Sequence, residues 1–302
     1  MTRFLYFFIA FGLFSCDIIN PEEDIPAFIE IESISFNAIP NSGSNLHDVK
    51  EGWIFVDNVL IGAFSPGKPF PVLAEGTVEL VVEAGIHEDG ISVATRIYPY
   101  MERYITTIDL VPGQVTKVNP VFQYRDNITF FLIEEFENST FFTDDRDGNE
   151  ETSVAFEEIG AFEGLSGRIE LTQENPQVDV ATNMAFTLPT SSSADTYLEI
   201  NFKTEAPIAI GVIASDGFGQ TTRLYGNGLN TTPEWTKVYI NLQESIAGNP
   251  APFYQVGFGA ELPFGLSEAT IMIDNIKLLH FCLLYTSPSP RDATLSRMPS
   301  SA

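Results

Sequence analysis

Hydrophobic and polar residues alternate with a period of two along much of the chain from Phe28 onward. Residues 29–36, 53–57 and 77–85 show this alternation clearly. Side chains on a strand point to the two faces of its sheet in turn, so the pattern predicts half-buried strands. Gly, Pro, Asn and Asp separate the runs at intervals of about 8 to 12 residues. No apolar i, i+3, i+4 stripe persists over successive turns, so we predict an all-β protein with little helix.

The pattern falls into two regions that we expect to fold as separate domains, residues 28–124 and residues 127–281. Their lengths are ordinary for β domains. The 25 Phe and 10 Tyr of the chain, together with many Val and Ile, supply enough apolar material for two cores.

The first region contains a motif of strands and turns that covers about thirty residues. Two predicted strands flank an Asp57-Asn58 turn, and a Pro-rich loop then leads to a turn at Gly76 and a further strand. The motif consists of Val56, Asp57, Ile61, Gly62, Pro71, Gly76 and Thr77. It resembles the PEGA-type β-sandwich module. The resemblance implies a small β-sandwich that serves as a spacer or binds a partner.

The second region has three motifs whose order is informative. An early Phe-Glu strand lies at residues 130–138, a central strand begins at Trp235, and the last strand contains Ile273-Asp274-Asn275-Ile276. This order resembles the jelly-roll carbohydrate-binding-module superfamily, in which the position of Trp235 is usually part of the core. The resemblance implies a jelly-roll β-sandwich and does not identify a ligand.

The same resemblance implies a structural calcium site between the first and last strands of the second domain. Glu135, Glu137 and Asp274 are the positions that would bind Ca2+. Calcium takes six to eight oxygen ligands, so these carboxylates would form only part of the shell. The alternative is that they are ordinary solvated strand residues, with Asp274 ending a hairpin.

Residues 143–151 form an acidic segment that is a weaker candidate for calcium. Asp145, Asp147 and Asn149 alternate as in an EF-hand loop, but Gly148 comes too early and no Glu occupies the twelfth position. A solvated acidic loop is the favoured interpretation.

Three aromatic residues of the second domain have polar neighbours suited to sugar binding, namely Phe218, Tyr225 and Tyr254. An exposed ring can stack on a pyranose while nearby Asn, Gln, Asp or Arg side chains bind its hydroxyls. Most aromatic residues pack in cores, so packing is the alternative at each position.

The residues that catalysis requires are sparse. Only His47, His87 and His280 are present, and the sequence lacks a nucleophile elbow and a His-containing metal motif. A glycosidase needs two carboxylates that face each other across a cleft. Glu134, Glu135 and Glu137 instead lie along one predicted strand. We therefore expect a protein that is not an enzyme.

The N-terminus has the pattern of an export signal, with Arg3 followed by an apolar run to Phe14. The run is too short to span a bilayer. Its end, Leu13-Phe14-Ser15-Cys16, resembles the bacterial lipoprotein box. This implies a signal peptide over residues 1–15 and lipidation of Cys16. The alternative is a plain signal peptide, or an apolar N-terminal helix with an incidental Cys. Residues 16–27 are acidic and interrupted by prolines, as in the tethers of Bacteroidetes-type outer-membrane lipoproteins.

Residues 282–302 differ from the rest of the chain in composition. They are rich in Ser, Pro and Arg and show no strand period. They resemble a tail that arises when sequencing-adapter DNA is translated, so we expect them to be non-native and to take no part in the fold.

The net charge narrows the range of partners. The chain has 15 Lys and Arg against 41 Asp and Glu, a formal charge of −26. Nucleic acid and anionic lipid headgroups are poor partners for such a negatively charged surface. Divalent cations are compatible with it.

Our hypothesis is therefore a lipid-anchored outer-membrane protein, on the cell surface or the periplasmic face, that touches the membrane only through its anchor. Its C-terminal jelly roll would bind a glycan or another surface ligand. The alternative is a non-catalytic structural or assembly subunit of an outer-membrane protein complex, which would bind an envelope protein instead.

Overall fold

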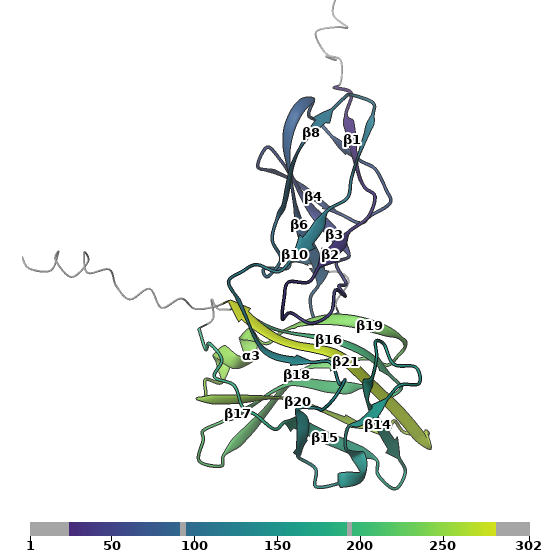
Figure 1. The fold of residues 1–302 in the computed structure, drawn as a ribbon, viewed down its shortest axis with the longest axis vertical. Helices are drawn as coiled ribbons and strands as arrows, with labels where there is room; N and C mark the ends of the chain where they lie inside the picture. Colours follow the sequence, from purple (N-terminus) through teal and green to yellow (C-terminus); the bar gives the residue numbers. More distant parts are fainter. Residues whose placement is uncertain (1–23, 91–94, 192–194, 282–302) are drawn as a thin grey trace, which may run out of the picture.

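Two β-sandwiches arranged end to end make up the protein (Figure 1). The structure is a computed structural model that describes residues 24–90, 95–191 and 195–281. The prediction of an all-β fold is confirmed. Among the described residues, helical structure is confined to α3 (Gln243–Gly248) and the 3-10 turn η2 (Glu150–Thr152). No described helix has the length and apolar character needed to cross a membrane.

The N-terminal sandwich contains three sheets. Their strand orders are β5-β1-β9, β10-β2, and β4-β3-β6-β7 with β8 also paired to β6. The pairs β1–β9 and β2–β10 are parallel. The strands are β1 (Ala27–Ile31), β2 (Ser35–Asn37), β3 (Glu51–Val56), β4 (Val59–Phe64), β5 (Phe70–Val72), β6 (Gly76–His87), β7 (Thr95–Ile97), β8 (Tyr104–Leu110), β9 (Val115–Val118) and β10 (Val121–Gln123).

The predicted turn between β3 and β4 is confirmed. Asp57 and Asn58 connect the two strands with φ angles of 48° and 65°. Two successive positive φ values are typical of the tight turns that fit the twist of a hairpin. Asp and Asn adopt this conformation more readily than other non-glycine residues, which explains their place here.

The C-terminal sandwich is a jelly roll of two sheets. One sheet has the order β13-β14-β21-β16-β19, with β11 also paired to β21, and the other has the order β12-β15-β20-β17-β18. The strands are β11 (Ile128–Glu134), β12 (Phe142–Asp145), β13 (Ala155–Glu157), β14 (Ser166–Thr172), β15 (Gln177–Thr182), β16 (Thr196–Thr204), β17 (Ile208–Ser215), β18 (Thr221–Leu229), β19 (Thr232–Asn241), β20 (Phe253–Glu261) and β21 (Glu268–Phe281).

Strand β21 changes its partner halfway along its length. Residues 268–273 pair with β14, and residues 276–281 pair with β11. At the change, Asn275 has a φ of 48° and the register with β16 shifts. An irregularity of this kind redirects side chains locally. It leaves Asp274 between the start of β14 and the end of β11.

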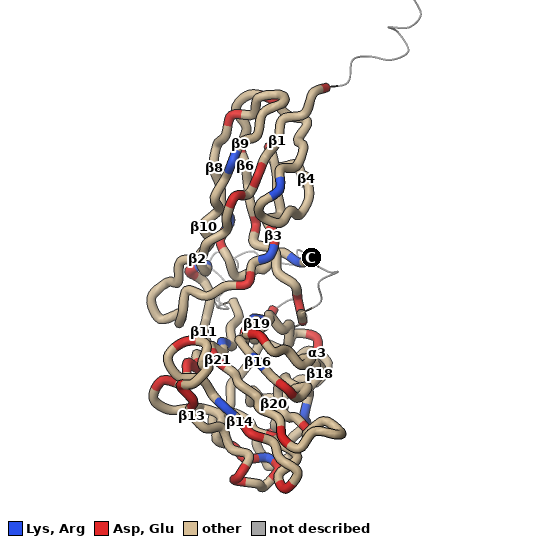
Figure 2. The backbone as a smooth tube through the Cα atoms, turned by 90° about the vertical axis from the view of Figure 1, so that its right-hand side faces the viewer, with Lys and Arg blue, Asp and Glu red and all other residues tan. Residues whose placement is uncertain are grey.

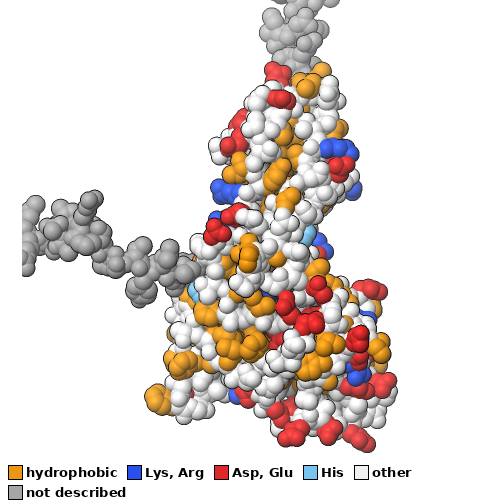
Figure 3. Space-filling model, viewed as in Figure 1, with side chains coloured by type: hydrophobic (Ala, Val, Ile, Leu, Met, Phe, Trp, Pro, Cys, Tyr) orange, Lys and Arg blue, Asp and Glu red, His pale blue; other side chains and the backbone are white. Residues whose placement is uncertain are grey.

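Each sandwich has its own hydrophobic core, formed by the inward-facing residues of its strands. Ile54, Leu80 and Val82 belong to the first core, and Ile210 and Phe258 belong to the second. The first core also includes Tyr197, Tyr239 and Leu279 from the jelly roll. The packing is therefore continuous across the junction, where the two parts meet closely on the face seen in Figure 3.

A buried carboxylate, Glu199 on β16, lies at this junction. It accepts hydrogen bonds from the hydroxyls of Tyr98 (2.6 Å) and Tyr124 (2.9 and 3.0 Å), both in the N-terminal sandwich. It also forms an ion pair with Lys237 Nζ at 2.7 Å, and both side chains are almost fully buried. Burial by itself would raise the pKa of Glu199, but Lys237, Lys277 and the hydrogen bonds hold it below its usual value.

The loop between β2 and β3 completes the junction from the N-terminal side. Lys237 Nζ donates to the carbonyl of Leu46 (3.1 Å), and Lys277 Nζ donates to the carbonyl of Ser44 (3.3 Å). Burial lowers the pKa of Lys277 to about 8, although Glu199 opposes the shift. The part of the outer sheet face that carries Glu199, Lys237 and Lys277 is thus covered by the other domain.

Acidic residues are spread over both domains and are numerous in the loops farthest from the N-terminal sandwich (Figure 2). The excess of negative charge seen in the sequence is therefore a property of the whole surface rather than of one patch.

We expect Glu199→Gln to lower the free energy of unfolding by about 3–5 kcal/mol, because it leaves the buried Lys237 without its paired carboxylate. Lys277→Met is the matched control. It keeps the Glu199–Lys237 pair and should cost about 1 kcal/mol or less, since the Lys277 ammonium makes only long contacts, of 3.3 and 3.5 Å. Denaturant unfolding of both variants measures this, and equal losses would contradict it.

Candidate functional site

A trough crosses the outer face of the β12-β15-β20-β17-β18 sheet. Its floor consists of Gly228 on β18, Ala209 on β17 and Gly259 on β20, which lie directly opposite one another on neighbouring strands. Asp179 on β15 continues the row beyond Gly259. This sheet is the layer of the jelly roll farther from the N-terminal sandwich, so the trough faces away from it (Figure 1).

Tyr225 forms one rim of the trough. It lies in an irregular part of β18 opposite Gly211. A Cβ atom added at Gly257 would lie 2.5 Å from the Tyr225 hydroxyl, and one added at Gly211 would lie 2.2 Å from the carbonyl oxygen of Leu224. Both distances are too short for any side chain larger than hydrogen. The glycines of β17 and β20 therefore allow the ring to lie against the sheet.

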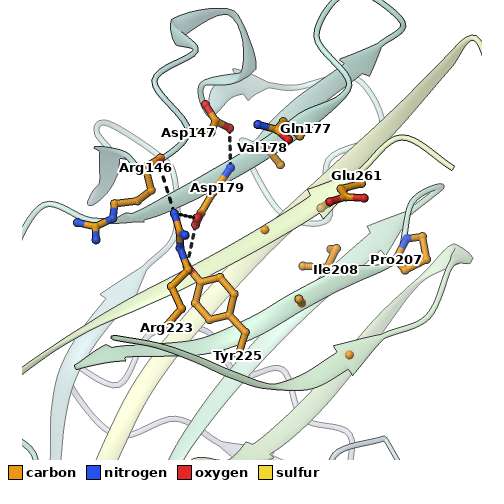
Figure 4. A pocket seen from close by; sticks show the side chains of 14 residues that line it. Arg146, Asp147, Gln177, Val178, Asp179, Pro207, Ile208, Arg223, Tyr225 and Glu261 are labelled. Carbon is orange, nitrogen blue, oxygen red and sulfur yellow. Dashed lines mark hydrogen bonds and ion pairs between the residues drawn. The ribbon is translucent and has the colours of Figure 1, made fainter. Parts of the chain in front are cut away.

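Polar contacts hold the Tyr225 side chain in place. Its hydroxyl donates to Asp179 Oδ1 at 2.8 Å, and Asp179 also forms an ion pair with Arg223 (Figure 4). Arg223 in turn donates to the carbonyl of Arg146 at 3.2 Å. Burial and the bond to Asp179 raise the pKa of Tyr225. The hydroxyl therefore stays protonated, and the ring has a fixed orientation.

The opposite rim consists of Pro207, Glu261 and Gln177. Glu261 and Gln177 are paired residues on β20 and β15, two positions along each strand from the floor row. Two strand residues span about 7 Å, which sets the distance between this rim and the floor row. The open cavity between the rims has a volume of about 710 Å³.

The three predicted aromatic ligands have different positions in the structure. Tyr225 lines the trough. Phe218 is 95% exposed, but it lies in the turn between β17 and β18, outside the residues that line the trough. Tyr254 is fully buried, and its hydroxyl bonds to the backbone of Asn249 and Ala251. The expectation that Tyr254 contacts a ligand is therefore corrected, because inward-facing residues of β20 belong to the core.

The three carboxylates predicted to bind calcium contact different parts of the protein. Asp274 Oδ2 accepts from Ser166 Oγ at 2.8 Å and from the Glu163 amide at 3.3 Å. Glu137 Oε1 accepts from the Leu165 amide at 3.0 Å. Glu135 lies beside Gly43 of the β2–β3 loop. No group of three or more acidic, His or Cys side chains suited to a metal occurs among the described residues, and this calcium site stays a prediction.

The acidic segment 143–151 has its carboxylates bonded to its own backbone. Asp145 Oδ1 accepts from the amides of Asp147 (3.1 Å) and Gly148 (2.8 Å). Asp147 Oδ2 accepts from the Asp179 amide at 2.7 Å. These bonds fix the loop beside the trough.

Trp235 is half-buried on the outer face of β19 rather than in the core. Its indole nitrogen donates to the carbonyl of Gly160 at 3.0 Å, and its ring contacts Phe162. The core position implied by the sequence resemblance is therefore corrected here, because the loop before β14 covers the ring from outside.

Several residues of the trough were not identified from the sequence, namely Gln177, Asp179, Ala209, Gly228, Gly259 and Glu261. One signal was present. Gly257 and Gly259 alternate in the segment that forms β20, and glycine inside a strand often marks a close approach of another group. The remaining residues become neighbours only through strand pairing.

Comparisons with known proteins found similarity to solved structures. No family model and no curated protein sequence matches the chain. Similar solved structures include a family 29 carbohydrate-binding module complexed with cellulohexaose (14% identity, TM-score 0.33, covering 52% of this chain and 94% of that chain). TmCBM61 in complex with β-1,4-galactotriose is 16% identical, with a TM-score of 0.30, and the match covers 45% of this chain and 88% of that chain. An arabinose-bound MgGH51 α-L-arabinofuranosidase is 12% identical, with a TM-score of 0.36, and 27% of its chain is covered.

We expect the stability of the wild type to fall as the pH rises from about 4 to about 6, relative to Asp274→Asn. Burial raises the pKa of Asp274 from 3.8 to about 6. The folded state therefore holds this proton more tightly than the unfolded state, and ionisation costs up to about 3 kcal/mol. Unfolding curves of both proteins across this pH range measure the difference, and parallel curves would contradict it.

The same pair of proteins tests calcium. If Asp274 is a ligand, millimolar calcium at neutral pH should raise the unfolding temperature of the wild type and not that of Asp274→Asn. An identical response of the two proteins would exclude Asp274 as a ligand.

Proposed function

We propose that the protein binds a glycan in the trough on the outer face of the jelly roll. The observation that carries the proposal is the Tyr225 ring, which is fixed by Asp179 beside a floor of Gly228, Ala209 and Gly259. A flat aromatic face next to backbone without bulky side chains leaves room for a pyranose to lie against both. Tyrosine suits such a site because it offers apolar area at little cost in conformational entropy.

The direction of the trough favours an extended chain as the ligand. Its floor crosses three neighbouring strands, which are about 4.8 Å apart. Three strands enclose two such intervals, about 10 Å, so the floor is roughly as long as two sugar rings. Charged groups at the rim provide hydrogen bonds for hydroxyls, and water-mediated contacts can add to them.

We further propose that the protein is attached to the outer membrane through a lipid on Cys16, a residue that lies outside the described part of the chain. The described chain begins at the end of the N-terminal sandwich that is remote from the jelly roll (Figure 1). An anchor on that side would hold the trough away from the membrane, with the N-terminal sandwich as a spacer.

One observation favours the second candidate function, a structural or assembly subunit. Ile105, Val81, Phe55 and Leu60 form an apolar row across β8, β6, β3 and β4 on the outer face of their sheet. Ile105 is 59% exposed and Leu60 is 50% exposed. Val81 is 8% exposed, so only the two ends of the row are open to solvent, and these exposed apolar side chains are suited to contact with another protein.

We expect Tyr225→Ala to weaken glycan binding about tenfold, because it removes the stacking surface, worth about 1–2 kcal/mol. Binding is found on a glycan array and measured by calorimetry with the best oligosaccharide. Tyr225→Phe keeps the ring and should bind nearly as well as the wild type. Phe218→Ala removes an exposed ring outside the trough and is the matched control. Absence of array binding, or equal affinities of the two alanine variants, would refute the proposal.

We expect Cys16→Ala to abolish labelling with a fatty-acid analogue and to release the protein from membranes, because a lipid chain contributes about 0.8 kcal/mol per buried methylene group. Labelling in cells followed by membrane fractionation measures both effects. Persistent labelling of the variant would show that Cys16 is not the modified residue.

A further inference from the structure

Glu261 and Gln177 differ from the other polar residues of the trough because their side chains make no hydrogen bond or ion pair within the described part of the chain. Both are exposed, both line the cavity, and they are directly paired across β20 and β15. Figure 4 shows them on the side of the trough opposite Tyr225. Their polar atoms are therefore available to a ligand.

The other charged groups of the trough are already engaged. Asp179 binds the Tyr225 hydroxyl and Arg223, and Arg146 pairs with Asp144 at 3.3 Å. Asp147 accepts backbone amides with both of its oxygens. The guanidinium charges are thus balanced by carboxylates, whereas the charge of Glu261 is not.

We propose that Glu261 and Gln177 form the hydroxyl-recognition pair of the glycan site, and that they select neutral glycans over glycans rich in uronic acid. This inference rests on the proposed function and specifies the class of its ligand. A carboxylate accepts hydrogen bonds from two hydroxyls, and hydrogen bonds to a charged group are stronger than neutral ones. The Gln177 amide both donates and accepts, so it matches a hydroxyl in either role.

The position of the pair explains the selection. Side chains opposite each other on paired strands have Cβ atoms about 4.5–5.5 Å apart, which brings both polar ends to one sugar ring. A neutral ring that stacks on Tyr225 presents hydroxyls along its edge to this rim. A uronic acid in the same place would put a second carboxylate beside Glu261 without a free cation to compensate, and like charges at short range repel.

The test compares three ligands on the complete protein by calorimetry: a neutral β-1,4-galactan oligosaccharide, oligogalacturonate, and its methyl ester, in which the charge is removed. Neutral hexasaccharides of glucose and mannose are included as further neutral ligands. We expect the wild type to bind at least one neutral ligand at least tenfold more tightly than oligogalacturonate, and esterification to improve binding of the uronate chain.

The variants are Glu261→Gln and the matched control Glu268→Gln, which changes an exposed carboxylate at the start of β21, outside the trough. Glu261→Gln should weaken binding of the neutral ligand about tenfold and reduce the discrimination against oligogalacturonate. Glu268→Gln should do neither. Both residues are exposed, so we expect the two variants to unfold at the same temperature as the wild type. Equal unfolding temperatures show that the fold is unchanged.

Two kinds of failure are distinguishable. If binding depends on Tyr225 but Glu261→Gln behaves like Glu268→Gln, or if oligogalacturonate binds best, this inference is wrong and the proposed function stands. If the wild type binds none of these ligands and no glycan on the array, the proposed function fails and the inference fails with it.

Discussion

The arrangement of the whole molecule depends on one buried carboxylate. Glu199 joins Lys237 of its own sheet to Tyr98 and Tyr124 of the other domain, away from water. Burial of these charges would be costly if any partner were missing, so the network is formed only when the domains are docked correctly. In this relative orientation of the two sandwiches, each of these polar groups has a partner. The docked domain covers the part of one jelly-roll sheet around Glu199, whereas the outer face of the other sheet lies away from the N-terminal sandwich (Figure 1).

On that remaining face, small residues determine the shape of the site. Gly228, Ala209 and Gly259 form a floor without bulky side chains, and Gly257 leaves room for the Tyr225 ring. Glycine weakens a strand because it adds no packing and has a flexible backbone. The buried residues of β17 and β20, on the inner face of the same strands, compensate for this loss. A sheet with one well-packed face can therefore have a hollow on its other face.

The abundant carboxylates of the chain serve mostly as structural acceptors where they are buried or half-buried. Asp274 binds Ser166 and backbone amides, and Asp147 supports its loop and β15. Asp179 orients Tyr225. In a protein with a formal charge of −26, the acids available to a ligand are those left without a partner beside a shaped surface. Glu261 has this property, and its neighbour Gln177 shares it within the described chain.

The sequence by itself determined the class of fold, because a period of two in side-chain polarity is a local property of strands. It also determined the β3–β4 turn, since Asp57 and Asn58 favour the backbone conformation that the turn needs. It identified Tyr225 from its polar neighbours, but it did not separate that residue from Tyr254, because the two differ only in the face of the sheet they occupy. The contacts of Glu199 with Tyr98 and the row from Gly228 to Asp179 join residues from distant segments. Such contacts arise from strand register and domain docking, which only the tertiary structure decides.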